Sequence, residues 1–126
     1  MEKHAYVVAR NEALKTTVNR LKNVTVEKQV AEGTISIEFN RKGLEHLQHD
    51  FFPNKWTRDA ILRNIDSVLK SAEYVSEANY TGENPMIDKF CYYKVTLLNK
   101  EWFLNIRKQK NGKAYLYSMT DKIKRE

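Results

Sequence analysis

The chain has little cysteine, proline or glycine: one, two and four residues, respectively, among 126. The single cysteine, Cys91, excludes an intramolecular disulfide and argues against a structural zinc site. No apolar run approaches the roughly 18 residues of a membrane span. Phosphate loops, dinucleotide fingerprints, Cys-x-x-Cys pairs and Gly-x-Ser-x-Gly elbows are missing, and Asp50, Asp59 and Asp66 form no magnesium-type cluster. Nucleotide-dependent and metal-dependent chemistry are disfavoured, and we expect no cofactor.

The composition, with 41% hydrophobic and 30% charged residues, is typical of a globular protein, and the length fits one domain over residues 1–126. A net charge of +6 and a pI near 9.4 favour a polyanionic partner, nucleic acid or an anionic membrane surface. A basic surface kept for solubility is the alternative. Charged residues interrupt the apolar stretch of the first ten residues too early for a signal peptide. We expect the chain either to work in the cytoplasm of a producing or target cell or to be delivered within a larger exported or injected protein.

Hydrophobic periodicity predicts the order of the elements. Helical spacing appears over 11–22, 42–50 and, most clearly, 57–72, where Ile61, Leu62, Ile65, Val68 and Leu69 form one stripe. Residues 34–39 alternate as a half-buried strand, whereas 24–32 are ambiguous between strand and loop. Residues 79–88 have the composition of a loop. Three strands are predicted to follow, over 90–98, 101–108 and 114–119.

The three strands are predicted to form a meander. Asn99-Lys100 is a tight connection, and Asn111-Gly112 is typical of a type I′ hairpin turn, in which both central residues take positive φ. Trp102, Leu104 and Ile106 alternate with Phe103, Asn105 and Arg107, and Cys91 is expected to be a core residue. The predicted fold is therefore α+β: N-terminal helices, one of them long, packed on an antiparallel sheet that ends in a three-stranded meander.

Two histidines, His46 and His49, share one face of the predicted helix over 42–50. An imidazole titrates near neutral pH, so either can act as general acid or base. Zinc would require a further ligand, and only His4 remains, so we predict no metal site. The alternative is a polar helix face carrying two ordinary surface histidines.

Basic and hydroxyl side chains gather on the last two predicted strands. RNA cleavage by 2′-hydroxyl attack needs a base, an acid, and cations or donors for the charge that develops on the phosphate. Arginine binds phosphate oxygens bidentately, and serine or threonine adds donors. A wet, basic outer face is an equally common explanation. The residues concerned are Arg107, Lys108, Lys110, Lys113, Tyr115, Tyr117, Ser118 and Thr120.

Aromatic residues also interleave with cations in this region. Exposed rings can stack unpaired bases while cations hold the phosphates, although about half of these rings should be core. No RNP-type signature of an RNA-recognition module is present. The rings are Tyr92, Tyr93, Trp102, Phe103, Tyr115 and Tyr117, and the cations are Lys94, Arg107 and Lys113.

Residues 43–120 resemble the barnase–EndoU–colicin E5/D–RelE superfamily of small ribonucleases, especially its phage, mobile-element and contact-toxin branches. The resemblance rests on Gly-Leu-Glu-His-Leu-Gln-His-Asp at 43–50, the amphipathic helix that follows it, and three strand segments. These segments are Tyr93-Lys94-Val95-Thr96, Trp102-Phe103-Leu104-Asn105-Ile106-Arg107 and Tyr115-Leu116-Tyr117-Ser118-Met119-Thr120. Residues 1–40 would be an extension of one helix and one strand.

The resemblance implies a helix packed on one face of an antiparallel sheet and a metal-independent active site. By position, the catalytic residues would be His46 or His49, Arg107, and Ser118 or Thr120. Family members cleave RNA, often tRNA, and leave a 2′,3′-cyclic phosphate, and toxin members are neutralised by an immunity or antitoxin protein. Lys94, Lys108, Lys113 and Tyr117 would bind the RNA.

Two alternatives to an RNA-cleaving toxin remain open on the sequence. The charge and the aromatic residues alone fit a nucleic-acid-binding module without catalysis. Exposed strand edges and the lack of a complete catalytic signature fit a protein-interaction module of a phage or mobile element.

Overall fold

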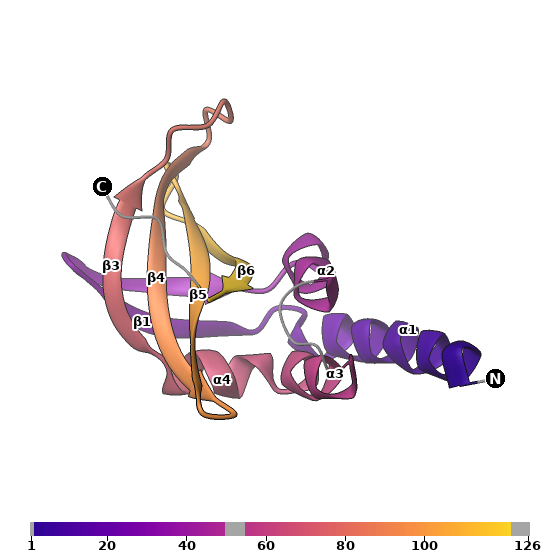
Figure 1. Ribbon diagram of the computed structural model, residues 1–126. Helices are drawn as coiled ribbons and strands as arrows, with labels where there is room; N and C mark the ends of the chain where they lie inside the picture. Colours follow the sequence, from indigo (N-terminus) through magenta and orange to yellow (C-terminus); the bar gives the residue numbers. More distant parts are fainter. Residues whose placement is uncertain (1, 50–54, 122–126) are drawn as a thin grey trace.

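A computed structural model describes residues 2–49 and 55–121, with side chains described from Val8 to Gln48 and from Trp56 to Asp121. Within these residues, four helices and six strands make an α+β fold, as predicted (Figure 1). In chain order the elements are α1 (Glu2–Leu21), β1 (Thr25–Val30), β2 (Gly33–Glu38), α2 (Arg41–His49), α3 (Lys55–Arg63), α4 (Ile65–Ser71), β3 (Glu73–Asn79), β4 (Ile87–Leu97), β5 (Lys100–Gln109) and β6 (Ala114–Thr120). None of the described helices is long and apolar enough to cross a membrane.

The strands form one curled sheet in the order β1-β2-β6-β5-β4-β3. Neighbouring strands are antiparallel except β2 and β6, which run parallel and pair only through Ile37 with Ala114 and Glu38 with Tyr115. This short pairing leaves the rest of β6 free to contact α2, which follows β2 directly and packs against β6. The sheet therefore joins an N-terminal hairpin to a C-terminal meander at the place where α2 begins.

The three predicted strands of the meander are confirmed as β4, β5 and β6, and a further strand, β3, precedes them and pairs with β4. Residues 73–79 form β3, an edge strand that the sequence did not reveal. A bulge between Tyr74 and Ser76 interrupts its alternation of buried and exposed side chains, which removes the period-two signal. β4 also begins at Ile87, so the loop that was predicted over 79–88 is shorter.

The single long helix predicted over 57–72 is two helices, α3 and α4, separated at Asn64. The side-chain amide of Asn64 donates to the Ala60 carbonyl at 2.9 Å, and the Asn64 backbone N–H donates to Ile61 at 3.1 Å instead. A side chain thus replaces the backbone donor at this turn, and the helix axis breaks. α4 packs on the sheet against β1 and β4, whereas α3 packs against α1 and α2.

The N-terminal region is more ordered than its periodicity predicts. α1 begins at Glu2 rather than near Asn11, and the residues that were ambiguous between strand and loop form β1. Residues 2–10 contain no glycine or proline, and they extend the helix without a strong apolar stripe. The predicted strand over 34–39 and the helix over 42–50 are confirmed as β2 and α2 within one or two residues. Asp50, the last residue of that predicted helix, lies outside the described residues.

Both predicted turns of the meander differ in detail. The β4–β5 turn is centred on Leu98 and Asn99, which both take positive φ, rather than on Asn99 and Lys100. In the β5–β6 turn Gly112 has a φ of 88°, but Asn111 does not have a positive φ, so this is not a type I′ turn. The Gly112 N–H donates to the Gln109 carbonyl at 3.0 Å, which closes a longer turn with one left-handed glycine.

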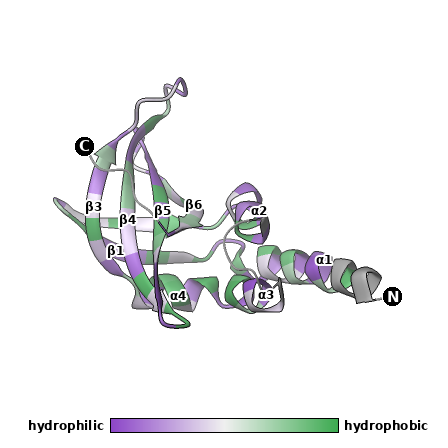
Figure 2. Ribbon diagram, in the orientation of Figure 1, coloured by the Kyte–Doolittle hydropathy of each residue, from purple (hydrophilic) through white to green (hydrophobic). Residues whose placement is uncertain are grey.

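The alternation predicted for β5 is confirmed. Trp102, Leu104 and Ile106 are buried in the main core, as is Cys91 of β4, together with side chains of all four described helices and of β1, β2 and β6. Hydrophobic and hydrophilic residues are interspersed along β4 and β5 (Figure 2). The opposite surface of the sheet, called the second face below, carries the side chains that alternate with these core residues. Its members on β4, β5 and β6 are Phe90, Tyr92, Lys94, Phe103, Asn105, Arg107, Tyr115, Tyr117, Ser118 and Thr120.

Candidate functional site

Arg107 and Tyr117 are stacked at the centre of the second face. The guanidinium carbon of Arg107 lies 3.4 Å from the centroid of the Tyr117 ring. A bulge in the β5–β6 pairing causes this contact: Asn105 pairs with Ser118 and Ile106 pairs with Leu116, so Tyr117 has no partner in the register. Bulges re-aim a side chain, and this one places the tyrosine against the arginine of the neighbouring strand.

Helix α2 brings His46 into contact with the same tyrosine. The imidazole and the Tyr117 ring meet edge to face, with centroids 4.6 Å apart. The Asn40 side chain accepts the Gly43 N–H at 2.8 Å and caps the helix. Gly43 then lies so close to the Leu116 carbonyl of β6 that a β-carbon there would overlap it. His46 follows Gly43 by three residues, so it faces the same strand.

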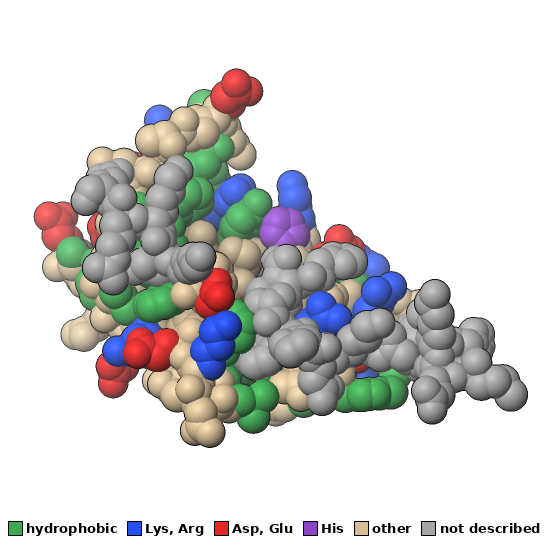
Figure 3. Space-filling view, in the orientation of Figure 1, with side chains coloured by type: hydrophobic (Ala, Val, Ile, Leu, Met, Phe, Trp, Pro, Cys, Tyr) green, Lys and Arg blue, Asp and Glu red, His purple; other side chains and the backbone are tan. Residues whose placement is uncertain are grey.

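Two further rings continue the cluster beyond Arg107. The guanidinium carbon lies 5.5 Å from the centroid of Phe90, its cross-strand neighbour on β4, and 6.0 Å from that of Tyr80. Tyr80 and Phe90 meet edge to face at 5.4 Å. Side chains from α2, β6, β5, β4 and the loop between β3 and β4 therefore form one row, Tyr80–Phe90–Arg107–Tyr117–His46, which we call the aromatic row. Figure 3 shows a histidine at the surface beside α2, with basic and hydrophobic side chains on its sheet side.

Arg107 has no acidic partner among the described residues. The described ion pairs join Arg20 to Asp66, Arg41 to Glu45, Lys89 to Glu77, Lys94 to Glu101 and Lys100 to Asp121. The Arg107 Nε is buried without a hydrogen-bond acceptor in the same part of the chain. A half-buried guanidinium that is held by rings instead of a carboxylate keeps its positive charge available for an anion.

The hydroxyl residues of β6 extend along the second face from this cluster. Ser118 pairs with Asn105 and Thr120 with Phe103, so both lie on the surface that carries Arg107. The Asn105 Oδ1 is buried without a donor among the described residues. Ser118 is thus in the neighbourhood of Arg107, and Thr120 lies one residue pair further from it.

The remaining predicted site residues are scattered. Lys94 pairs with Phe103 at the far end of the second face and forms a 3.7 Å ion pair with Glu101. Lys108 is the cross-strand partner of the buried Ala114, so it belongs to the other face of β5. Lys113 is exposed in the β5–β6 turn. The backbone of His49 ends α2, but its side chain lies outside the described set.

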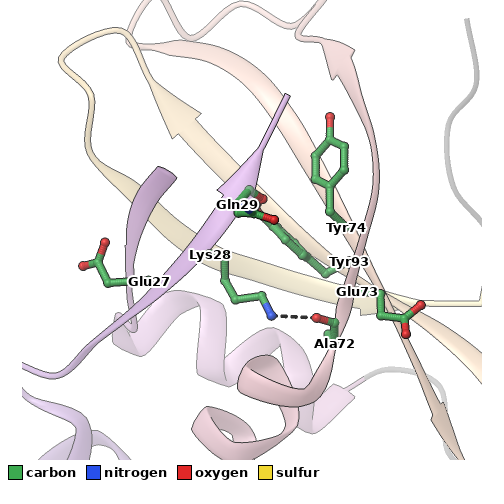
Figure 4. A pocket seen from close by; sticks show the side chains of 7 residues that line it. All are labelled: Glu27, Lys28, Gln29, Ala72, Glu73, Tyr74 and Tyr93. Carbon is green, nitrogen blue, oxygen red and sulfur yellow. Dashed lines mark hydrogen bonds between the residues drawn. The ribbon is translucent and has the colours of Figure 1, made fainter. Parts of the chain in front are cut away.

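The structure contains a separate cleft of about 530 Å³ between the two edge strands, β1 and β3 (Figure 4). The Lys28 ammonium donates to the Ala72 carbonyl at 2.6 Å and to the Lys70 carbonyl at 3.2 Å, which caps the end of α4. Burial lowers the pKa of Lys28. The Tyr93 hydroxyl donates to the Gln29 carbonyl at 2.6 Å. These bonds tie the edge strand β1 to the end of α4 and to β4, which gives Lys28 and Tyr93 a structural role.

Sequence reasoning missed Phe90 and Tyr80 as members of the site. The alternation of β5 had already placed Asn105 and Arg107 on one face, so the cross-strand partner Phe90 could have been found once the register was known. Tyr80 lies in a loop, where no hydrophobic periodicity indicates which surface a side chain joins. Among the described residues no group of three or more His, Cys, Asp or Glu side chains is placed to hold a metal ion.

Comparisons of the chain with protein-family models, curated proteins and solved structures give no significant match. Functional inference therefore rests on the geometry of the second face.

Proposed function

We propose that the protein is a metal-independent endoribonuclease whose active site lies on the second face of the sheet. One observation carries the proposal: His46 and Arg107 contact the same side chain, Tyr117, at 4.6 and 3.4 Å. Phosphodiester cleavage without a metal needs a base, an acid and a cation or donor for the phosphate charge. An imidazole can supply the base, and a guanidinium without a carboxylate partner can supply the cation. A phosphate placed over Tyr117 would have both beside it.

In this reaction the ribose 2′-oxygen attacks the adjacent phosphorus while the bond from phosphorus to the 5′-oxygen breaks. His46 accepts the 2′-hydroxyl proton, and Arg107 stabilises the negative charge on the phosphate oxygens through bidentate hydrogen bonds. Ser118 supplies a further donor from the same face. The leaving 5′-oxygen takes a proton from a second acid, for which His49, three residues along α2, is the candidate. The products are a 2′,3′-cyclic phosphate and a 5′-hydroxyl.

The direct test is cleavage of tRNA and of total RNA by the purified protein in excess EDTA. Removing His46 or Arg107 by alanine substitution should lower the cleavage rate by about 100-fold or more, the usual effect of losing a general base or a charge-stabilising donor. Lys108→Ala is the matched control, because it removes the same charge from the next residue but from the other face of β5.

The proposal fails if the purified protein leaves all RNA intact. It also fails if the Lys108 variant loses as much activity as the Arg107 variant, since the effect would then follow net charge rather than position.

We also propose, from the resemblance to toxin ribonucleases, that the protein cleaves RNA inside a cell and that a dedicated immunity or antitoxin protein neutralises it. Expression in bacteria should arrest growth and degrade RNA, tRNA being the first species to examine, and His46→Ala should relieve both effects. Normal growth of cells making the unaltered, folded protein would contradict this part alone.

Nucleic-acid binding without cleavage is the second candidate function. Arg107 flanked by Tyr117, Phe90 and Tyr80 is an arrangement that can bind a strand without reacting with it. It predicts salt-dependent binding, with affinity falling linearly on a log–log plot, and no product on RNA gels.

A further inference from the structure

The two rings on the far side of Arg107 from Tyr117 in the order of the aromatic row, Tyr80 and Phe90, do not belong to the main core. Both are half-buried, and neither belongs to the buried cluster nor to the partly buried side chains that pack against it. They contact each other and the guanidinium of Arg107 instead. Rings in an ordinary supporting role would be expected to cover core residues, so these two require another explanation.

The loop between β3 and β4 holds Tyr80 in place. The Tyr80 hydroxyl accepts the Asn84 N–H at 3.2 Å, and Gly82 approaches the ring so closely that a β-carbon there would overlap it. A second contact fixes the loop itself: the Lys110 N–H of the β5–β6 turn donates to the Met86 carbonyl at 2.9 Å. The ring is therefore ordered before any ligand arrives, which reduces the entropy cost of binding.

We infer that Tyr80 and Phe90 form a stacking subsite for one unpaired base of the RNA, next to the phosphate that Arg107 binds. The inference deepens the proposed function and rests on it for the position of the phosphate. Its central observation is the 5.5 and 6.0 Å separations between the Arg107 guanidinium carbon and the two rings, which are within the length of one nucleotide. Aromatic rings beside a phosphate-binding cation are the common arrangement for single-stranded nucleic acid.

The subsite selects the substrate class. A base inside a duplex is stacked on its neighbours and has no free face to offer a protein ring, whereas a base in a loop or at an end does. The substrate is accordingly an unpaired stretch of RNA. Lys110 and Lys113 lie in the turn that contacts the Tyr80 loop, so flanking phosphates meet positive charge there.

Binding can be measured apart from cleavage with a fluorescent single-stranded oligonucleotide that carries 2′-deoxy sugars and cannot react by 2′-attack. A blunt duplex of the same sequence is the competitor probe. The unaltered protein should prefer the single strand by about tenfold or more. Phe90→Ala and Tyr80→Ala should each weaken single-strand binding about five- to hundredfold, the range measured for loss of one stacked base. Duplex binding should change little.

Tyr80→Phe keeps the ring and should keep most of the affinity, although it loses the bond from the Asn84 amide. Phe103→Ala is the matched control: it removes a ring from the same face of β5, four residues from Arg107 and outside the row. Circular dichroism and thermal melting verify that each variant folds. A stacking variant that fails to fold is replaced by Phe90→Leu, which retains an apolar side chain without a ring face.

Equal affinity for single strand and duplex, or unchanged single-strand binding in the folded Tyr80 and Phe90 variants, overturns the inference. These outcomes differ from failure of the proposed function. If the single strand binds through both rings but RNA stays intact, the subsite inference stands and the ribonuclease proposal fails. If the folded Tyr80 and Phe90 variants bind the single strand and cleave RNA as well as the unaltered protein does, the ribonuclease proposal stands and the subsite inference fails.

Discussion

The Arg107 guanidinium lies 3.4 Å from the centroid of the Tyr117 ring because a bulge removes Tyr117 from the pairing of β5 with β6. Strict alternation would place the consecutive residues Tyr117 and Ser118 on opposite faces, and the extra residue lets both lie on the second face. The bulge thus sets which side chains share a surface. His46 and Arg107, which are 61 positions apart in the numbering, meet through this one tyrosine.

Tyr117 should act as a positioning residue through its ring. Tyr117→Phe keeps the stack with Arg107 and should retain most RNA cleavage, whereas Tyr117→Leu removes the ring face and should lower the cleavage rate about tenfold, as expected for a lost cation–π contact of roughly 1–2 kcal/mol. Initial rates on tRNA, with melting temperatures as the folding check, measure the difference. Equal losses in both variants would instead assign a chemical role to the Tyr117 hydroxyl.

Gly43 is predicted to be required for the approach of α2 to β6. A methyl group at position 43 would overlap the Leu116 carbonyl, so Gly43→Ala should force the helix outward and destabilise the protein by about 1–3 kcal/mol. RNA cleavage should fall as well, because His46 moves with the helix. Urea unfolding measures the first effect. Lys42→Ala, on the exposed neighbouring position, is the control and should change stability by less than about 0.5 kcal/mol. Unchanged stability of the Gly43 variant would contradict the close packing.

Periodicity predicted much of the fold because most elements bury one face. β2 and β5 alternate cleanly, and Ile35, Ile37, Trp102, Leu104 and Ile106 are all buried as that pattern requires. The pattern failed where a local contact changes the backbone. Asn64 divides an uninterrupted apolar stripe through a side-chain bond to Ala60, and the bulge after Tyr74 hides β3. Both effects depend on individual hydrogen bonds, which a hydropathy pattern does not contain.

The sequence predicted which kinds of side chain make up the candidate site, but not all of the residues that meet there. His46, Arg107, Tyr117 and Ser118 were named from the sequence, and the fold brings the first three into contact. Lys108 was named with them, yet it occupies the opposite face from Arg107, as alternation along a strand requires. Phe90 and Tyr80 enter only through the β4–β5 register and the loop conformation. Long-range register is set by packing and turn geometry together, so one sequence does not reveal it.

The Arg20–Asp66 pair should make stability depend on pH at the acidic end. The Arg20 guanidinium donates to both Asp66 oxygens, at 3.0 and 2.9 Å, and these bonds lower the pKa of Asp66. A lowered carboxyl pKa stabilises the folded state at pH values above the ordinary aspartate range, near 3.9, and the effect is lost as pH falls through the lowered pKa. Asp66→Asn should cost about 1 kcal/mol or less at pH 7, because Arg20 is 43% exposed and solvent screens the pair.

The difference between Asp66→Asn and the unaltered protein should shrink toward zero in denaturant titrations below pH 3. Asp121→Asn is the control, because its 3.3 Å pair with Lys100 lies at an exposed site. A difference that stays constant from pH 7 to pH 2 would exclude the ion pair as its source.

Cys91 should be inert to thiol reagents in the native protein. Its side chain is fully buried, and burial raises the pKa of the thiol to about 11. At pH 8 an exposed thiol is partly ionised and reacts, whereas that of Cys91 stays protonated and covered. Native protein should therefore show no mass increase with iodoacetamide at pH 8 over a period in which protein in guanidinium chloride is fully modified. Modification of both samples at similar rates would contradict the burial of β4.

The hydroxyl of Tyr93 should hold the edge strand β1 against the meander. It donates to the Gln29 carbonyl at 2.6 Å across the cleft between β1 and β3. Tyr93→Phe removes this bond and leaves the ring in the core, so we expect a loss of about 1 kcal/mol in the free energy of unfolding, because water can reach the exposed Gln29 and replace part of the bond. A loss of this bond alone should also speed amide hydrogen exchange in residues 25–30 of β1. Exchange in β5 should stay unchanged after correction for global stability. Tyr115→Phe, on the second face, is the matched control and should alter neither. Uniform acceleration across both strands would mean that the bond supports the whole fold rather than this edge.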